Sequence, residues 1–354
     1  MRTLVRCMAF LIVISWLCFG AYADDNCTVN GTEFPLLSEQ ISIQGKASVS
    51  KIINELKQLP NLQSVSWSGI TLSFKHILQL KEAFPQVFFD CTFACFKSEY
   101  NTGMTYAKIS TNKMMSRDLY NFLAVMSNLE KLDLFSLRIS VAKMEELFEA
   151  YPSISFGWRV PVPNRANRTV RSDATAFSTL HRDVKHRFGS EEFDLLRYCP
   201  NMLALDLGHN KIDDVSFLKY FPHLKVLILA DNQISDLSEL VSFVPELEYL
   251  ELFINQISDI SPLASLKYLR HLNIAHNQVK DLSPILEMPQ LIRCWVAYNP
   301  FPEEQAQRLK DAMPDTHFEF AAYWSTDKGW RKPSKYYEAI YKMFRNYTYI
   351  PLPD

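Results

Sequence analysis

The pattern that decides the fold is contained in the stretch Leu250-Glu251-Leu252-Phe253-Ile254-Asn255-Gln256-Ile257-Ser258-Asp259-Ile260-Ser261-Pro262-Leu263. Apolar residues stand eight, five and three positions before Asn255, and again two, five and eight positions after it. The same frame recurs around five asparagines, at intervals of 22, 23, 22 and 22 residues: Asn210, Asn232, Asn255, Asn277 and Asn299. After each of the first four, an aspartate follows at plus four and a serine at plus six. Such a fixed period predicts one structural unit per copy.

This is the leucine-rich repeat pattern, and each residue type has a mechanical role. Leu250 and Leu252 alternate with period two, so they share one face of a short strand. The asparagine amide suits the unpaired backbone of the turn that follows, and the oxygens of the aspartate and serine suit free N–H groups at a helical turn. Pro262 and Pro284 fit the first position of such a turn. One coil cannot bury its apolar side alone, so the repeats must stack.

The predicted fold class is therefore α/β, a leucine-rich repeat solenoid. We expect parallel strands on the concave face, short helical turns on the convex face, and longer helices in the N-terminal repeats and the C-terminal cap.

The N-terminal half carries longer, degenerate copies of the repeat. Residues 60–67 align with 127–134 at an offset of 67, and helical patterns follow at 74–84 and 141–151. A further helix, proline and strand at 303–320 predicts a C-terminal cap over the open core edge. The expected organisation is a signal peptide at 1–23, degenerate long repeats with two insertions at 24–198, regular repeats at 199–301, and a cap with a tail at 302–354.

The first residues read as an export signal. Arg2 and Arg6 precede an apolar run at 8–19, and Ala21-Tyr22-Ala23 supplies a small-x-small cleavage site near Ala23. The run is shorter than the ~20 residues that a membrane span needs. We expect a secreted or cell-surface protein without a span in the mature chain. Losing Arg2 and Arg6 takes the formal charge from −2 to −4, which argues against nucleic-acid binding.

The mature chain keeps an odd number of cysteines: Cys27, Cys91, Cys95, Cys199 and Cys294. At least one is therefore unpaired or pairs with another chain. Cys294 occupies the inward strand position of Leu227 and Leu250, so we interpret it as core filler. Cys91 and Cys95 lie four apart on an apparent strand and cannot pair unless the chain turns between them. Pairing among the other four stays open, and no metal-binding spacing is present.

No catalytic or cofactor-binding constellation is evident. The stretch His181-Arg182-Asp183-Val184-Lys185 resembles a protein-kinase catalytic loop, but Phe188 stands where that motif needs a metal-binding asparagine. An enzyme would need a catalytic cluster within the insertion at 159–187. That insertion is basic, with Arg159, Arg165, Arg168, Arg171, Arg182, Lys185 and Arg187. It is either a solvated loop or a site for an anionic polymer.

The outward strand positions predict a partner-binding surface. An apolar strip of Val226, Ile228, Tyr249, Phe253 and Trp295 is bordered by Glu251, His271, Asn273 and Arg293. Aromatic residues beside arginine are typical of protein interfaces. The alternative is that a flanking segment, such as the tyrosine-rich tail at 336–349, folds over this strip.

The 22-residue repeat resembles the internalin type, and three other stretches carry a closer resemblance. They are Ser172-Asp173-Ala174-Thr175-Ala176-Phe177-Ser178-Thr179, Leu196-Arg197-Tyr198-Cys199 and Ala322-Tyr323-Trp324-Ser325-Thr326-Asp327-Lys328-Gly329-Trp330-Arg331. Together with the repeats they are similar to exported leucine-rich repeat proteins of Gram-positive, gut-associated bacteria. The resemblance implies the fold and export. For internalins, it implies receptor binding through the concave face.

The function expected from the sequence is thus non-enzymatic binding, with the concave face engaging a protein of unknown identity. A cell-envelope protein that binds anionic wall polymer or carbohydrate is the second hypothesis, and an enzyme is the third.

Overall fold

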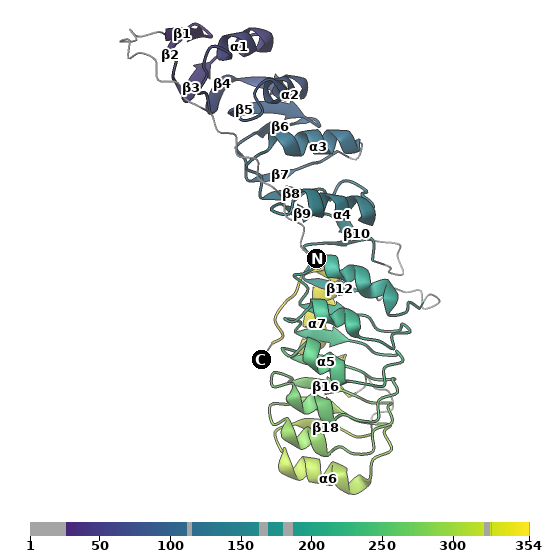
Figure 1. The fold of residues 1–354 in the computed structure, drawn as a ribbon. Helices are drawn as coiled ribbons and strands as arrows, with labels where there is room; N and C mark the ends of the chain where they lie inside the picture. The colour runs from purple at the N-terminus through teal and green to yellow at the C-terminus, as the bar shows by residue number, and fades with distance from the viewer. Residues whose placement is uncertain are drawn as a thin grey trace, which may run out of the picture. The chain divides into compact units, whose positions relative to one another are not determined.

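The structure is a computed structural model that describes residues 26–111, 115–162, 169–179, 187–321, 326 and 328–353 (Figure 1). The expected leader at 1–23 and the kinase-like stretch at 181–185 lie outside these residues. The chain divides into two compact units, one of Met1–Met104 with Ser116–Asn128, the other of Thr105–Met115 with Leu129–Asp354. In the part described, no helix is both long and apolar enough to cross a membrane.

The first unit alternates strands with helices, as the long repeats predict. Its elements are β1 (Asn26–Val29), β2 (Thr32–Pro35), β3 (Gln40–Gln44), α1 (Val49–Leu56), β4 (Ser64–Ser73), α2 (Phe74–Ala83), β5 (Phe88–Cys95), β6 (Ser98–Asn101) and α3 (Ser116–Val125). Strands β3, β4 and β5 pair in parallel, and β6 adds an antiparallel edge. The helix predicted at 74–84 is confirmed as α2, and the Ser73 hydroxyl accepts a hydrogen bond from the His76 N–H at 3.3 Å.

Strand β5 shows how the first unit forms its core. Its residues alternate between buried and exposed, so that Phe89, Cys91, Phe93 and Cys95 all face inward. Phe93 packs against Phe122 of α3, with ring centroids 6.1 Å apart. Cys91 and Cys95 are on the same strand, as expected, and both are free thiols. Burial raises the pKa of each thiol to about 12, so both stay protonated and unreactive.

The second unit contains the regular repeats. Its elements are β7 (Tyr106–Lys108), β8 (Lys131–Asp133), α4 (Val141–Ala150), β9 (Ser155–Gly157), β10 (Arg159–Val160), β11 (Val170–Arg171), β12 (Ala176–Ser178), η1 (Glu191–Tyr198), β13 (Ala204–Asp206), η2 (Ser216–Tyr220), β14 (Val226–Ile228), α5 (Ser238–Phe243), β15 (Tyr249–Glu251), η3 (Ser261–Ser265), β16 (His271–Asn273), η4 (Ser283–Glu287), β17 (Arg293–Trp295), α6 (Glu303–Ala312), β18 (His317–Glu319) and α7 (Lys335–Asn346), where η denotes a 3₁₀ helix. The helix predicted at 141–151 is confirmed as α4.

Strands β12 to β18 form one parallel sheet of seven, each paired with the next. The register places inward residues in one column: Phe177, Leu205, Leu227, Leu250, Leu272 and Cys294. Every member of this column is fully buried. The stacked leucine-rich repeat solenoid and the role of Cys294 as core filler are thus confirmed. The expected assignment of concave and convex faces stays a prediction, as do the segment limits.

The repeated asparagines connect neighbouring coils. The Asn255 side-chain oxygen accepts a hydrogen bond from the Ile234 N–H of the preceding coil at 3.0 Å. Its amide nitrogen donates to the Leu229 carbonyl of that coil at 3.0 Å and to its own Leu252 carbonyl at 2.9 Å. Equivalent bonds are made by Asn232, Asn277 and Asn299. Each asparagine therefore supplies partners for backbone groups that two coils would otherwise leave unpaired.

The turns around the asparagines show one feature that the sequence did not reveal. The residue before each asparagine has a left-handed backbone, with φ between 52° and 59°: His209, Asp231, Ile254, His276 and Tyr298. None of these is glycine, and for a β-branched isoleucine this conformation is strained. The surrounding hydrogen bonds must therefore hold the turn in place.

The helical turns are capped by the aspartate rather than by the serine. The Asp236 carboxylate accepts a hydrogen bond from the Ser238 N–H at 2.8 Å, and Asp259 does the same for Ser261. The predicted capping role of the serine oxygen is wrong, because the serine N–H is itself the group that needs a partner. Pro262 is the second residue of η3 rather than the first, a position where the missing N–H is equally harmless.

The helix, proline and strand predicted at 303–320 form α6 and β18. Strand β18 pairs with β17 at the end of the seven-stranded sheet, with Phe318 opposite Cys294. The Gln305 side chain of α6 accepts a hydrogen bond from the Leu282 N–H at 2.6 Å, which joins this last unit to the coil before it.

Replacing Leu250 with alanine should lower the free energy of unfolding by ~2–5 kcal/mol, because it leaves a cavity in the fully buried column. Urea denaturation of the purified chain measures this loss. Leu37, which is 71% exposed, is the matched control, and Leu37→Ala should leave the midpoint nearly unchanged. Equal effects of the two substitutions would contradict the assigned column.

Asn255→Ala should destabilise the second unit by ~1–3 kcal/mol, since it leaves buried backbone groups of two coils without partners. The neighbouring Gln256 has an exposed side chain, so Gln256→Ala tests substitution at the same turn without loss of the ladder. Thermal melts of both variants and of the parent measure the change in melting temperature. An Asn255→Ala melt that coincides with the parent curve would count against the ladder.

Candidate interaction surface

The predicted strip lies on one face of the seven-stranded sheet, which we call the outer face. The strand pairing sets Tyr249 beside His271 and His271 beside Arg293, and sets Glu251, Asn273 and Trp295 in a parallel row. The structure thus brings the predicted residues together on β14 to β17, with Phe253 just after β15.

The strip is nevertheless covered by the chain itself. All nine predicted residues are at most 5% exposed: Val226, Ile228, Tyr249, Glu251, Phe253, His271, Asn273, Arg293 and Trp295. Residues 328–353, which we call the C-terminal segment, fold back over the outer face, with α7 against β12 and β13 (Figure 1). The exposure expected from the sequence is therefore wrong, and the alternative of a tail that covers the strip is what the structure shows.

The physical reason is a second apolar core. Trp330, Ile340 and Met343 of the C-terminal segment are buried against Val226, Tyr249, Phe253 and Trp295. Leaving this strip in water would expose a contiguous apolar patch of a kind that single-chain soluble proteins rarely keep. Burial of the segment's own apolar side chains removes that patch and stabilises the fold.

Arg293 fixes the start of the segment. Its guanidinium carbon lies 4.3 Å from the Trp330 ring centre and 4.4 Å from that of Tyr336. It donates hydrogen bonds to the Trp330 carbonyl at 3.1 Å and to His271 Nδ1 at 3.0 Å. Burial and the charge of Arg293 lower the pKa of His271 to about 3, so this histidine is a neutral acceptor.

Glu251 forms the second attachment point. This carboxylate is 1% exposed and accepts hydrogen bonds from the Tyr249 hydroxyl at 2.8 Å, the Trp330 Nε1 at 2.9 Å and the Arg331 guanidinium at 2.7 Å. The carboxylate beside Arg331 raises the pKa of that guanidinium further. One ion pair, with Arg331, and two hydrogen bonds from neutral donors make the burial of Glu251 tolerable.

One part of the outer face stays open. A cleft of about 490 Å³ lies between β12–β15 and α7. Its sheet side is formed by Ser178, Asp206, Ile228, Tyr249 and Glu251, and its other side by Arg331, Tyr337, Ile340, Tyr341, Phe344, Arg345 and Tyr347. Three of the nine predicted residues therefore line the cleft, whereas the other six lie under the segment.

Asp206 is the most unusual group in this cleft. It is 4% exposed and accepts hydrogen bonds from the Ser178 hydroxyl at 2.9 Å and the Gly208 N–H at 3.2 Å. Burial raises the pKa of its carboxyl to about 6, against the opposing effects of Gly208 and Arg331. The sequence placed Asp206 on an outward position but gave no sign of its burial, which depends on α7.

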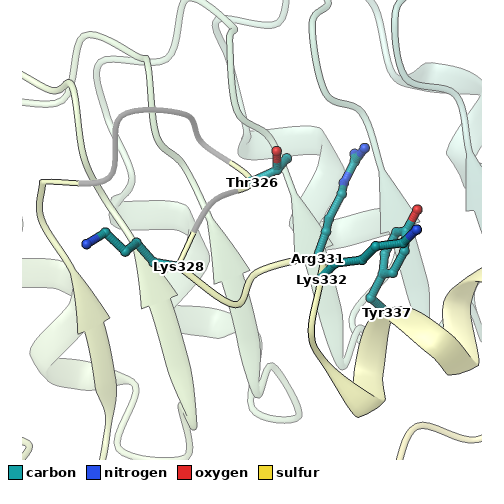
Figure 2. Close-up of a pocket in the computed structure, with 5 residues that line it drawn as sticks. All are labelled: Thr326, Lys328, Arg331, Lys332 and Tyr337. Carbon is teal, nitrogen blue, oxygen red and sulfur yellow. The ribbon is translucent and has the colours of Figure 1, made fainter.

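A second pocket, of about 500 Å³, opens beside the first and is lined by Thr326, Lys328, Arg331, Lys332 and Tyr337. Figure 2 shows the side chains of Arg331, Lys332 and Tyr337 close together on one side of the pocket, while the Lys328 side chain extends away from them on the other side. Arg331 and Tyr337 line both pockets and so form the partition between them. Because Glu251 already pairs with Arg331, the basic character of this pocket comes from Lys328 and Lys332.

The basic insertion at 159–187 is only partly described, since Arg165, Arg168, Arg182 and Lys185 lie outside the described residues. The other three basic side chains have partners within the chain. Arg159 donates to the Phe135 carbonyl at 2.6 Å, Arg171 pairs with Asp173 at 2.8 Å, and Arg187 pairs with Asp231 at 2.6 Å. These three side chains therefore make contacts within the chain.

Comparison with known proteins agrees with the repeats. The family pattern described as "Leucine Rich repeats (2 copies)" matches residues 200–242, 222–265 and 245–287. Residues 200–287 thus carry leucine-rich repeats, and stacked repeats of this kind form extended surfaces that are used for binding. No curated protein matches the chain. Among the described residues, no group of histidine, cysteine or acidic side chains could hold a metal ion.

Several solved structures are similar to parts of the chain. An internalin C2 from Listeria monocytogenes is 21% identical, with a TM-score of 0.34 over 48% of this chain and 84% of that one. An internalin from the same species is 17% identical, with a TM-score of 0.36 over 82% and 84%. A leucine-rich repeat protein of Leptospira interrogans is 18% identical, with a TM-score of 0.32 over 75% and 68%. Likeness at this level adds nothing to the fold that the repeats define.

The sequence raised the tail at 336–349 as an alternative cover for the strip, but it did not predict that residues of the C-terminal segment would line a cleft. A signal was present, because Tyr336, Ile340, Met343 and Phe344 recur at helical spacing and define an apolar stripe. The stripe predicts a helix that needs a partner surface, and the apolar strip on the sheet is that surface. Trp330 and Arg331 carried no comparable signal.

The raised pKa of Asp206 predicts a pH-dependent stability. Between pH 3.8, the usual pKa of an aspartate, and about pH 6, the Asp206 carboxyl is protonated in the folded state and ionised in the unfolded state. The contribution of this proton to stability is therefore full below about pH 4 and is lost as the pH rises through 6. Asp206→Asn should therefore unfold with a higher free energy than the parent at pH 7.5, by ~1–3 kcal/mol, and with nearly the same free energy at pH 4.

Denaturant titrations at both pH values measure this difference. Asp213, an exposed aspartate that accepts a hydrogen bond from Ser190, supplies the control variant Asp213→Asn, which should show no such pH-linked gain. An Asp206→Asn protein that is less stable than the parent at pH 7.5 would refute this account of the carboxyl.

Proposed function

We propose that this is an exported, non-enzymatic leucine-rich repeat protein that binds another protein on the concave side of its second unit, at the cleft between the sheet and α7. The observation that supports this surface is its open aromatic lining. Tyr341 is 53% exposed at the cleft, where Tyr337 and Phe344 also lie. Tyr337 and Phe344 are half-buried, and aromatic side chains gathered around one exposed member are typical of interface anchors.

The cleft has the mixed character that protein interfaces favour. Tyrosine and arginine side chains, here Tyr341 and Arg345, are enriched at interfaces because they combine a large contact area with polar ends. Ile340 and Met343 on the same helix are buried against the sheet, so α7 is held as a firm wall. A rigid wall lowers the entropy that binding would otherwise lose.

The covered part of the strip has a supporting role in this proposal. Trp295, Phe253 and Arg293 hold the C-terminal segment in place and so shape the cleft indirectly. Ile228, Tyr249 and Glu251 form its floor. A partner would thus contact a composite of repeat and tail rather than the bare sheet.

Export forms the second part of the proposal. It rests on the leader pattern of residues 1–23, with its two arginines, apolar run and small-x-small end. At a secreted or cell-surface location, the cleft would be accessible to extracellular partners. Binding of anionic wall polymer or carbohydrate through the basic insertion is less well supported, because Arg159, Arg171 and Arg187 already have partners within the chain.

The test begins with the mature chain as bait for secreted and surface proteins of the source organism. A captured protein is then purified and titrated against the parent, Tyr341→Ala and Tyr268→Ala. Tyr341→Ala should weaken binding by ~2 kcal/mol or more without changing the melting temperature, because its side chain is exposed. Tyr268 is 60% exposed and does not line the cleft, so Tyr268→Ala should bind like the parent.

Trp295→Ala separates the supporting role from the contact role. It should lose ~3–5 kcal/mol of stability, because Trp295 is buried in the second core.

Partner binding that is equal for the parent and Tyr341→Ala would exclude the cleft. Retention on wall material that disappears at high salt, with no protein captured, would favour the basic insertion instead.

A further inference from the structure

The cleft contains two carboxylates that differ in their charge balance. Glu251 is neutralised by Arg331 at 2.7 Å. Asp206 receives hydrogen bonds only from neutral donors, Ser178 and Gly208, and forms no ion pair with any of the described residues. The Arg331 charge acts on Asp206, but Arg331 makes its ion pair with Glu251, so Asp206 is a buried carboxylate without a cation in direct contact.

Such a group is unfavourable in the protein alone. A carboxylate moved away from water without a counter-ion loses solvation that two neutral hydrogen bonds restore only in part. A buried group with this imbalance, placed at an open cleft, is a candidate for binding a ligand that supplies the missing charge. A ligand that supplied this charge would be a cation.

The walls of the cleft suit an organic cation rather than a metal ion. Tyr249, Tyr337, Tyr341, Phe344 and Tyr347 surround the space. Aromatic faces attract ammonium and guanidinium groups and also pack against an apolar stem. The same protein already uses this chemistry next to the cleft, where the Arg293 guanidinium lies over the rings of Trp330 and Tyr336, at 4.3 and 4.4 Å.

Size and the remaining charges are compatible with this ligand. The cleft of about 490 Å³ lies within the ~300–1,000 Å³ that is usual for small-ligand pockets. The Arg331 charge is compensated by Glu251. Arg345 is exposed at the rim and contacts the Tyr341 hydroxyl at 3.4 Å, so solvent screens its repulsion.

We propose that this cleft binds an organic cation, namely the lysine or arginine side chain of a partner protein, with Asp206 as its counter-ion and the aromatic side chains as its walls. The inference rests on the proposed protein-binding function and names the chemical group that the partner inserts. A free small amine has the same chemistry and is the other source of such a cation.

Capped amino acids test this proposal directly. Isothermal titration at pH 7.5 and low salt would compare Nα-acetyl-lysine methylamide and Nα-acetyl-arginine methylamide with the neutral, similarly shaped Nα-acetyl-norleucine methylamide. The parent chain should bind at least one of the cationic probes about tenfold or more tightly than norleucine, the gain of one charge-assisted contact. Equal affinity for the cationic and neutral probes would overturn the proposal.

The variants identify the residue responsible. Asp206→Asn keeps one acceptor oxygen for the Gly208 N–H and places its amide nitrogen beside the Ser178 hydroxyl, which can accept a hydrogen bond. It should remove the preference for the cations, whereas Asp213→Asn should keep it. Circular dichroism confirms that each variant is folded. A cation preference that survives in Asp206→Asn would overturn the role of Asp206.

A last arm separates this inference from the proposed function. Propylamine serves as the free amine, and a Gly-Gly-Lys-Gly-Gly peptide with capped ends presents the same group on a chain. Tighter binding of the peptide supports a partner's side chain, whereas tighter binding of propylamine overturns that source. If a captured partner loses affinity in Tyr341→Ala but binds Asp206→Asn like the parent, the protein-binding function stands and the cation inference fails.

Discussion

The structure depends on the need to pair the backbone of every flat coil. A coil of 22 or 23 residues has only a three-residue strand, so most of its N–H and C=O groups must find partners outside that strand. The asparagine side chain meets this need by bonding to two coils at once, as Asn255 does with Ile234 and Leu229 of the preceding coil and with Leu252 of its own. Stacking is thus required by hydrogen bonding as well as by apolar burial, and the left-handed residues such as Ile254 are tolerated for the same reason.

The same stacking creates a surface that needs a cover. Parallel strands in register align their outward residues in rows, so chance apolar residues on neighbouring coils become a continuous strip. In this protein the chain covers the strip with its own C-terminal segment, fixed by Trp330 and by the Arg331–Glu251 ion pair. The covered part of the outer face is therefore a second core. The accessible part is the cleft beside α7, over β12 to β15.

The two carboxylates in the cleft, Glu251 and Asp206, differ in whether a cation pairs with them. Glu251 and Arg331 satisfy each other, as buried charges in a stable core should. Asp206 lies at the floor of the same space without such a partner. A fold selected for stability alone would favour asparagine or an apolar residue there. The Asp206 carboxylate and the tyrosines of α7 are the observations on which the proposed cation site rests.

The periodic residues alone determined the repeat architecture. Leucines at fixed spacing, the asparagines, and the helices at 74–84 and 141–151 are local patterns, and their consequences are read within one coil or between adjacent coils. The burial of the predicted strip under the C-terminal segment could not be predicted from such local patterns. Trp330 and Glu251 are 79 residues apart in sequence, and no local pattern indicates that they meet. The tertiary structure decided it, because burial and the pKa of Asp206 depend on where a distant helix comes to rest.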